Sequence, residues 1–180
     1  MKNRKRGFSL VELLIVLAVI AALIATITPV ALNAIKKAKA TQVAQNLKTI
    51  ASAIENKAYV DGLNDDGLVF ENTEDGFKEI ARDIDVTKYA VYYKVTDGKV
   101  NAIVTYVGDV DDTELKKVLP NVERETDDDD FAFAIDPAYD AYAKLYAADA
   151  YENGYYLNDD YVTAIKNGPV SYYEFEFTVY

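Results

Sequence analysis

Hydrophobic residues fill the first part of the chain almost without interruption. From Leu13 to Ile35, a stretch of 23 residues, no charged residue occurs. At about 1.5 Å per residue this stretch forms roughly 35 Å of helix, which exceeds the roughly 30 Å of a hydrocarbon core. The seven residues before the apolar run, Met1–Gly7, carry four positive charges and no negative one. The pattern predicts a membrane-spanning helix whose basic end stays on the cytoplasmic side.

Beyond this span the pattern becomes amphipathic. Apolar residues recur with the three-and-four spacing of one helix face, and polar residues fill the positions between them. We expect a single helix from about Ser9 to about Tyr59, roughly 75 Å long, which ends at the turn residues of 61–67. The stripe that should pack on a sheet consists of Ala40, Val43, Ala44, Leu47, Ile50, Ala51, Ile54 and Ala58.

Shorter periodic segments follow the long helix. Residues 89–95 and 99–107 are rich in β-branched and aromatic residues and flank Asp97-Gly98, a strong signal for a two-residue hairpin. Residues 173–179 alternate between apolar and polar side chains, which predicts a half-buried final strand. Further helices are expected at residues 76–84, 113–119 and 137–151, and a further strand at 131–135. The fold class is therefore α+β: a long N-terminal helix, transmembrane in its first half and amphipathic in its second, packed on a small antiparallel β-sheet.

Charge is divided unevenly along the chain. Residues 61–180 contain ten basic and 28 acidic residues, a net charge of −18, whereas the whole chain carries −11. An acidic surface repels a phosphate backbone, so no direct binding of nucleic acid is expected. These changes in charge and hydrophobic pattern divide the chain into four parts. They are a basic leader peptide (1–7), a transmembrane half-helix (8–35), an amphipathic half-helix (36–60) and an acidic globular head (61–180).

The chain contains no cysteine and no histidine. This composition excludes disulfides, thiolate and imidazole chemistry, and the nitrogen–sulfur ligand sets of zinc. Aspartate clusters at residues 65–66, 109–112, 127–130 and 159–160 have the ligand type that hard cations prefer, but none has the spacing of a calcium loop. We expect solvated loop acids and no cofactor, with calcium binding as the alternative. Because the sequence shows no nucleophile with a base and no phosphate-binding glycine loop, we expect no enzymatic activity.

The segment KRGFSLVELL, residues 5–14, resembles the leader and processing site of type IV pilins and pseudopilins. The resemblance implies a pilin-like fold and cleavage by a membrane peptidase between Gly7 and Phe8, followed by N-methylation of Phe8. It also places the acidic residue of the family at Glu12 and its helix-breaking proline at Pro29. No catalytic and no metal-binding residue follows from it.

Glu12 is the candidate assembly residue. Insertion of a carboxylate within an apolar helix costs about 2.5–3.5 kcal/mol at the centre of a bilayer and less near its surface. Its presence therefore indicates a functional role. Cleavage would leave a charged amine on Phe8, four residues away, and the two groups could pair within one subunit. The resemblance implies instead that Glu12 pairs with the Phe8 amine of a neighbouring subunit and sets the register of assembly. A solvated glutamate without a partner is the third interpretation.

Pro29 interrupts the hydrogen bonding of the predicted helix. It has no amide hydrogen, so the carbonyl of Ala25 loses its helical partner. The hydroxyls of Thr26 and Thr28 could satisfy the freed backbone groups. We expect a kink here, at which the helix could stretch in a fibre; a kink without a function is the alternative.

The residues and the resemblance together predict a structural subunit of a type IV pilus that serves adhesion, motility or DNA uptake. It would span the cytoplasmic membrane once before assembly and form a surface filament with copies of itself afterwards. The implied partners are the prepilin peptidase and methyltransferase, an assembly ATPase and a platform membrane protein. A pseudopilin of a type II secretion system is the first alternative, and a membrane-anchored binding module that does not polymerise is the second.

Overall fold

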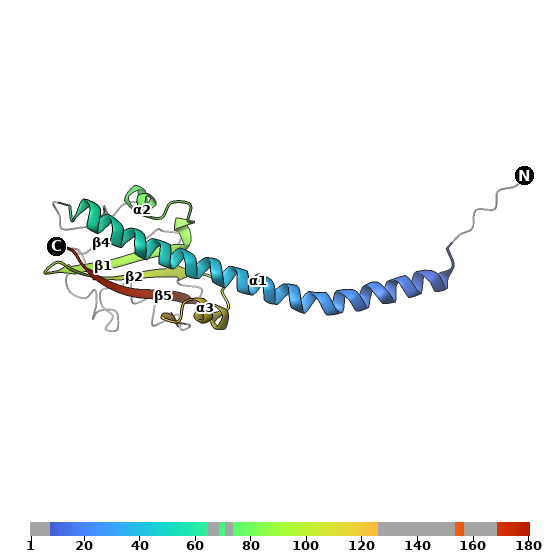
Figure 1. Cartoon of the computed structure of the whole chain (residues 1–180). Coiled ribbons are helices and arrows are strands. Elements are labelled where there is room, and N and C mark those ends of the chain that lie inside the picture. Colours follow the sequence, from blue (N-terminus) through green and yellow to red (C-terminus); the bar gives the residue numbers. More distant parts are fainter. Residues whose placement is uncertain (1–7, 65–68, 71–73, 126–153, 157–168) are drawn as a thin grey trace, which may run out of the picture.

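A single long helix projects from the folded head of the molecule. The computed structural model describes residues 8–64, 69–70, 74–125, 154–156 and 169–180. Helix α1, Leu10–Asp61, has 52 residues and begins after Ser9. Its second half lies along the head, whereas its first half projects away from the head toward the N-terminus (Figure 1). The predicted single helix from about Ser9 to about Tyr59 is confirmed.

In the described residues, the head is built on a five-stranded antiparallel sheet. Its strands are β1 (Tyr89–Thr96), β2 (Lys99–Val107), β3 (Val122–Glu125), β4 (Gly154–Tyr156) and β5 (Val170–Thr178). Their order is β3-β5-β2-β1-β4, so the last strand of the chain inserts between β2 and β3. The predicted hairpin joins β1 to β2, with Thr96 opposite Lys99. Asp97 and Gly98 have φ values of 52° and 78°, the left-handed geometry that a two-residue hairpin of this type requires.

The amphipathic stripe of α1 forms one side of the core. All eight residues predicted for this stripe are buried, and they pack in one cluster with the inner face of the sheet, including Tyr93, Val100 and Val104. Helix α2 (Glu74–Ile80) lies beside the end of α1 (Figure 1). Phe77 and Ile80 of this helix are buried in the same cluster. The second half of α1 is therefore a structural part of the head.

Some predicted boundaries are wrong by a few residues. The helix expected at 76–84 is Glu74–Ile80, because the chain turns after Ile80 and Asp83 takes a left-handed φ of 62°. The helix expected at 113–119 is α3, Asp112–Val118, and the short 3₁₀ helix Val86–Lys88 was not expected. Strand β5 begins at Val170, three residues before the predicted start. The strand expected at 131–135 and the helix expected at 137–151 lie outside the described residues.

Candidate functional site

No contact with the described part of the chain buries the first half of α1. Every described residue from Phe8 to Lys39 is exposed, and the large apolar side chains of this segment are 46–80% exposed. Among the described helices, α1 alone is long and apolar enough to cross a membrane. An apolar surface of this size is unfavourable in water, so this segment needs a lipid or protein environment.

The helix start places Glu12 in a capping box. The backbone N–H of Ser9 donates to Glu12 Oε2 at 2.8 Å, and the backbone N–H of Glu12 donates to Ser9 Oγ at 3.2 Å. The carboxylate therefore satisfies a free donor at the helix end and lies near the positive end of the helix dipole. Ser9 was not among the predicted site residues, although Ser9-x-x-Glu12 before an apolar run is the known signal for a capping box.

The processing residues lie next to this cap. Phe8 is the first described residue, is 77% exposed and immediately precedes the capping serine. Gly7 and the basic residues before it lie outside the described residues. The structure thus brings Phe8, Ser9 and Glu12 together at one helix end, and cleavage between Gly7 and Phe8 stays a prediction.

Helix α1 continues through Pro29. The predicted break is therefore limited to a bend: the first half of α1 changes direction along its length, but the helix does not end (Figure 1). The two threonines also bond differently from our expectation. Thr26 Oγ1 donates to the Leu23 carbonyl at 2.9 Å, and Thr28 Oγ1 donates to the Ile24 carbonyl at 2.7 Å. A helical hydroxyl can reach the carbonyl three or four residues before it. Thr28 therefore has both Ala25 and Ile24 within reach, and it donates to Ile24.

Helix α3 closes the end of the head from which the first half of α1 emerges (Figure 1). Asp111 caps α3 by accepting the Glu114 N–H at 3.1 Å, and it pairs with Lys36 of α1 at 3.5 Å. The Glu114 N–H and then Lys36 lower the pKa of Asp111. Asp112 pairs with Lys116 at 3.4 Å. This aspartate cluster therefore stabilises a helix and its contact with α1.

Within the described residues, no group of three aspartates or glutamates could hold a metal ion. The clusters at 65–66, 127–130 and 159–160 lie outside these residues, so the solvated acids expected there stay a prediction, with calcium binding as the alternative.

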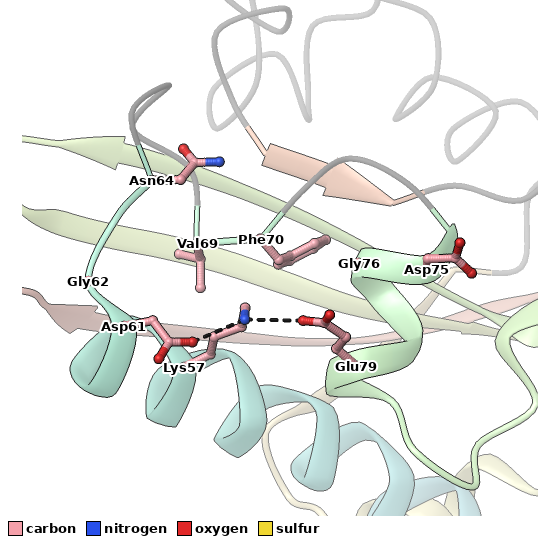
Figure 2. Close-up of a pocket in the computed structure, with 9 residues that line it drawn as sticks. All are labelled: Lys57, Asp61, Gly62, Asn64, Val69, Phe70, Asp75, Gly76 and Glu79. Atoms are coloured by element: carbon pink, nitrogen blue, oxygen red, sulfur yellow. Dashed lines mark hydrogen bonds and ion pairs between the residues drawn. The ribbon is translucent and has the colours of Figure 1, made fainter.

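A pocket of about 300 Å³ lies between the end of α1 and α2 (Figure 2). Inside it, Lys57 Nζ lies 3.1 Å from Asp61 Oδ2 and 3.3 Å from Glu79 Oε2. The hydrogen bonds to Asp61 and then to Glu79 raise the pKa of Lys57, against the opposing effect of burial. The lysine thus stays charged and ties the last turn of α1 to α2.

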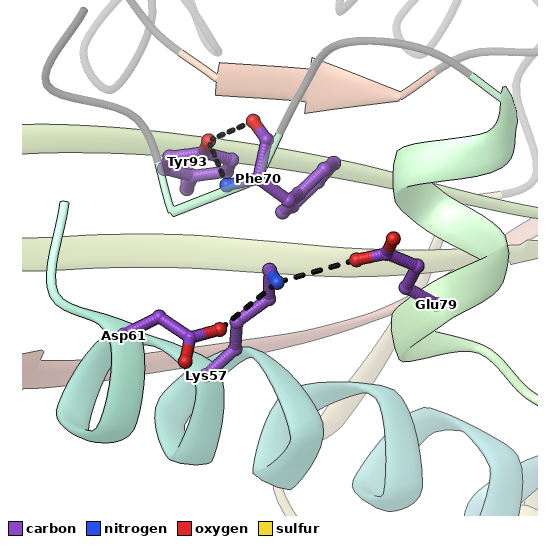
Figure 3. A network of polar contacts seen from close by, with 5 residues as sticks. All are labelled: Lys57, Asp61, Phe70, Glu79 and Tyr93. Carbon is purple, nitrogen blue, oxygen red and sulfur yellow. Dashed lines mark hydrogen bonds and ion pairs between the residues drawn. The ribbon is translucent and has the colours of Figure 1, made fainter. Parts of the chain in front are cut away.

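Tyr93 anchors the chain that leads from α1 to α2 (Figure 3). Its buried hydroxyl accepts the N–H groups of Val69 at 3.0 Å and Phe70 at 3.4 Å, and lies 3.3 Å from the Phe70 carbonyl, to which it donates. Burial raises the pKa of Tyr93 to about 12, and it also raises the pKa values of Tyr89 and Tyr92.

The head should therefore lose stability in alkali. An unfolded tyrosine ionises near pH 10, whereas the folded state keeps the Tyr93 proton up to about pH 12. Above pH 10 the unfolded state binds fewer protons, so each pH unit lowers the free energy of unfolding by up to about 1.4 kcal/mol per such tyrosine. Denaturant unfolding of the full chain in micelles, followed by circular dichroism at pH 8 and pH 11, measures this loss. The substitution Tyr93→Phe should reduce the loss and, by leaving two N–H groups without their acceptor, lower stability at pH 8 by about 1–3 kcal/mol. Equal stability of the wild-type chain at both pH values would contradict this prediction.

The long helix, exposed and apolar in its first half and packed on a small antiparallel sheet in its second, is a pilin-like α+β arrangement. Residues 2–28 match the family model described as the prokaryotic N-terminal methylation motif, so the chain carries the prepilin-type motif of type IV pilins and pseudopilins. This motif implies processing by a prepilin peptidase and assembly at a membrane. No curated protein and no solved structure matches the chain.

Proposed function

We propose that this protein is the structural subunit of a type IV pilus. It is inserted in the cytoplasmic membrane through residues 8–35, cleaved between Gly7 and Phe8, methylated at the Phe8 amine and polymerised into a surface filament. The observation that carries the proposal is the exposed apolar half of α1, joined without a linker to a folded head and headed by the methylation motif.

The physical basis is an exchange of one apolar environment for another. The exposed side chains of residues 8–35 can be buried in a bilayer before assembly, and against the same segment of neighbouring subunits afterwards. The heads then lie outside this helical core, where their net charge of −18 favours solvation. We infer that the protein itself is not an enzyme. The peptidase and methyltransferase would process it, and the assembly ATPase and the platform protein would drive its assembly.

Blocking the cleavage tests this proposal against the membrane-anchored binding module. The substitution Gly7→Val places a β-branched side chain at the bond to be cut. We expect the uncleaved chain to accumulate in the membrane and sheared surface filaments to disappear. A module that does not polymerise should keep its function with the leader attached. Filaments built from the uncleaved chain, or cells in which the cleaved wild-type chain forms no filament, would overturn the proposal.

A further inference from the structure

The lysines that follow the apolar run of α1 are unusual for the side of the membrane on which they lie. Lys36, Lys37 and Lys39 come directly after Ile35, and residues 36–54 contain four lysines and no acidic residue. Four residues of helix rise by about 6 Å, so these three lysines lie at the depth of the headgroups when residues 13–35 cross the bilayer. Positive residues beside a span ordinarily gather on its cytoplasmic side, which the basic leader already occupies. An equal number of lysines on the outer side therefore indicates a negatively charged partner there.

Helix α3 adds a further lysine at the same depth. It closes the end of the head from which the first half of α1 emerges (Figure 1). A pocket of about 670 Å³ lies between the two helices, and Asn33 and Ala34, next to the end of the apolar run, form part of its wall. The pocket therefore opens where the membrane span ends. Its charged lining residues are Lys36, Lys37, Asp111, Glu114 and Lys117.

The charges of this pocket favour an anion. Lys36 pairs with Asp111 and Lys117 pairs with Glu114, yet the two lysine side chains stay 60% and 63% exposed. Lys37 is also exposed, and no carboxylate of the described residues pairs with it. Three lysines and two carboxylates give the pocket a net charge of +1. An anionic group can bind here, although residues 61–180 together carry −18 and repel it elsewhere.

We propose that this pocket binds the phosphate of an anionic phospholipid in the outer leaflet of the cytoplasmic membrane. Lys37 makes the direct contact, and Lys36 and Lys117 complete the site from the two helices. The bound lipid holds the acidic head against a surface that would otherwise repel it. A lipid is favoured over the acidic head of a neighbouring subunit, because the end of the span sets the lysines at headgroup depth in every inserted chain. The inference rests on the membrane insertion of the proposed function but not on polymerisation.

An introduced tryptophan can report which lipids lie beside the pocket. The chain contains no tryptophan, and Ile35→Trp places one at the outer end of the span, where the side chain is 62% exposed. The full chain is reconstituted in vesicles of equal parts of phosphatidylcholine and phosphatidylglycerol. One or the other lipid is brominated in its acyl chains, so that it quenches tryptophan on contact, and the ratio of the two effects gives the preference for the anionic lipid.

We expect a preference of about fivefold for phosphatidylglycerol, the factor that one positive charge contributes near an anionic surface. The preference should disappear in about 1 M salt, where the Debye length falls to about 3 Å.

The test variant is Lys37→Gln/Lys117→Gln, made in the tryptophan-containing chain. It keeps the ion pair between Lys36 and Asp111 that joins α3 to α1. It removes two of the three lysines, so the net charge of the pocket changes from +1 to −1. The preference for phosphatidylglycerol should therefore fall to one or below.

Lys48→Gln/Lys99→Gln is the matched control. It removes the same charge from two exposed positions outside the pocket, so the fivefold preference should stay. Equal quenching by both lipids, or an unchanged preference in the test variant, would overturn the inference and leave a neighbouring head as the partner of these lysines. Loss of the preference on addition of inorganic phosphate at constant ionic strength would assign the pocket to a free anion and would also overturn it.

These results would leave the proposed function intact, because each of them requires an inserted chain. A tryptophan that neither brominated lipid quenches would show that the chain does not enter the bilayer. That outcome would overturn both the inference and the proposed function.

Discussion

Cells that produce the Glu12→Ala variant should insert and cleave the protein but form almost no filaments. Removal of one partner from a buried ion pair costs about 3–5 kcal/mol, so we expect at least a roughly 100-fold loss of sheared filaments. The variant removes the carboxylate that the capping box holds beside Phe8. Insertion itself should become easier, because an apolar helix without a carboxylate enters a bilayer at lower cost.

Glu55→Ala is the control for this experiment. Glu55 is the other glutamate of α1, but it lies in the second half of the helix, which packs on the head. Its loss should leave filament yield near the wild-type value. Quantitative immunoblots of the membrane fraction and of sheared filaments separate insertion, cleavage and assembly. A normal filament yield from Glu12→Ala would show that this residue has no role in assembly.

Deletion of residues 1–35 should yield a soluble, folded monomer. The described residues of the deleted part are all exposed, so the head loses no buried contact with them. The whole buried stripe from Ala40 to Ala58 is kept, as is the ion pair between Lys36 and Asp111. The net charge of −18 on residues 61–180 should discourage self-association.

Size-exclusion chromatography and thermal unfolding of the truncated protein measure this outcome. Deletion of residues 1–46 is the matched comparison, because it also removes the buried residues Ala40, Val43 and Ala44 and should destabilise the head. Aggregated or unfolded material from the shorter deletion would show that the apolar half-helix belongs to the core. A melting temperature that rises with calcium and falls with a chelator would reveal a metal site in the acidic loops, contrary to our expectation of solvated acids.

The structure of the periodic parts of the sequence could be predicted. The apolar span and the stripe of α1 are long, and each extra turn repeats the same pattern, so they identify the helix and its buried face. The hairpin was also predictable, because Asp97-Gly98 has the left-handed preference that its turn requires. The processing motif could be recognised from residues 5–14 because it combines a basic leader, a glycine–phenylalanine junction and one acid.

The local details depend on contacts that periodicity does not encode. The end of α2 is set by a turn with a left-handed Asp83, for which the sequence gives only a weak signal. The hydroxyl of Thr28 can reach the carbonyl three or four residues before it, so the sequence did not decide between Ala25 and Ile24 as its acceptor. The capping role of Ser9 could be recognised in the sequence from its spacing of three residues to Glu12. Because Glu12 is an acid in an apolar run, we interpreted it through a partner in another subunit instead.

We propose that the mature subunit begins at Phe8 and is methylated on its amine. Intact mass measurement of the protein from purified filaments, with fragmentation of its N-terminal peptide, decides whether this processing occurs. We expect a chain that lacks residues 1–7 and carries one additional methyl group on the Phe8 nitrogen. A chain in filaments that still begins at Met1 and carries an unmodified Gly7–Phe8 bond would contradict it.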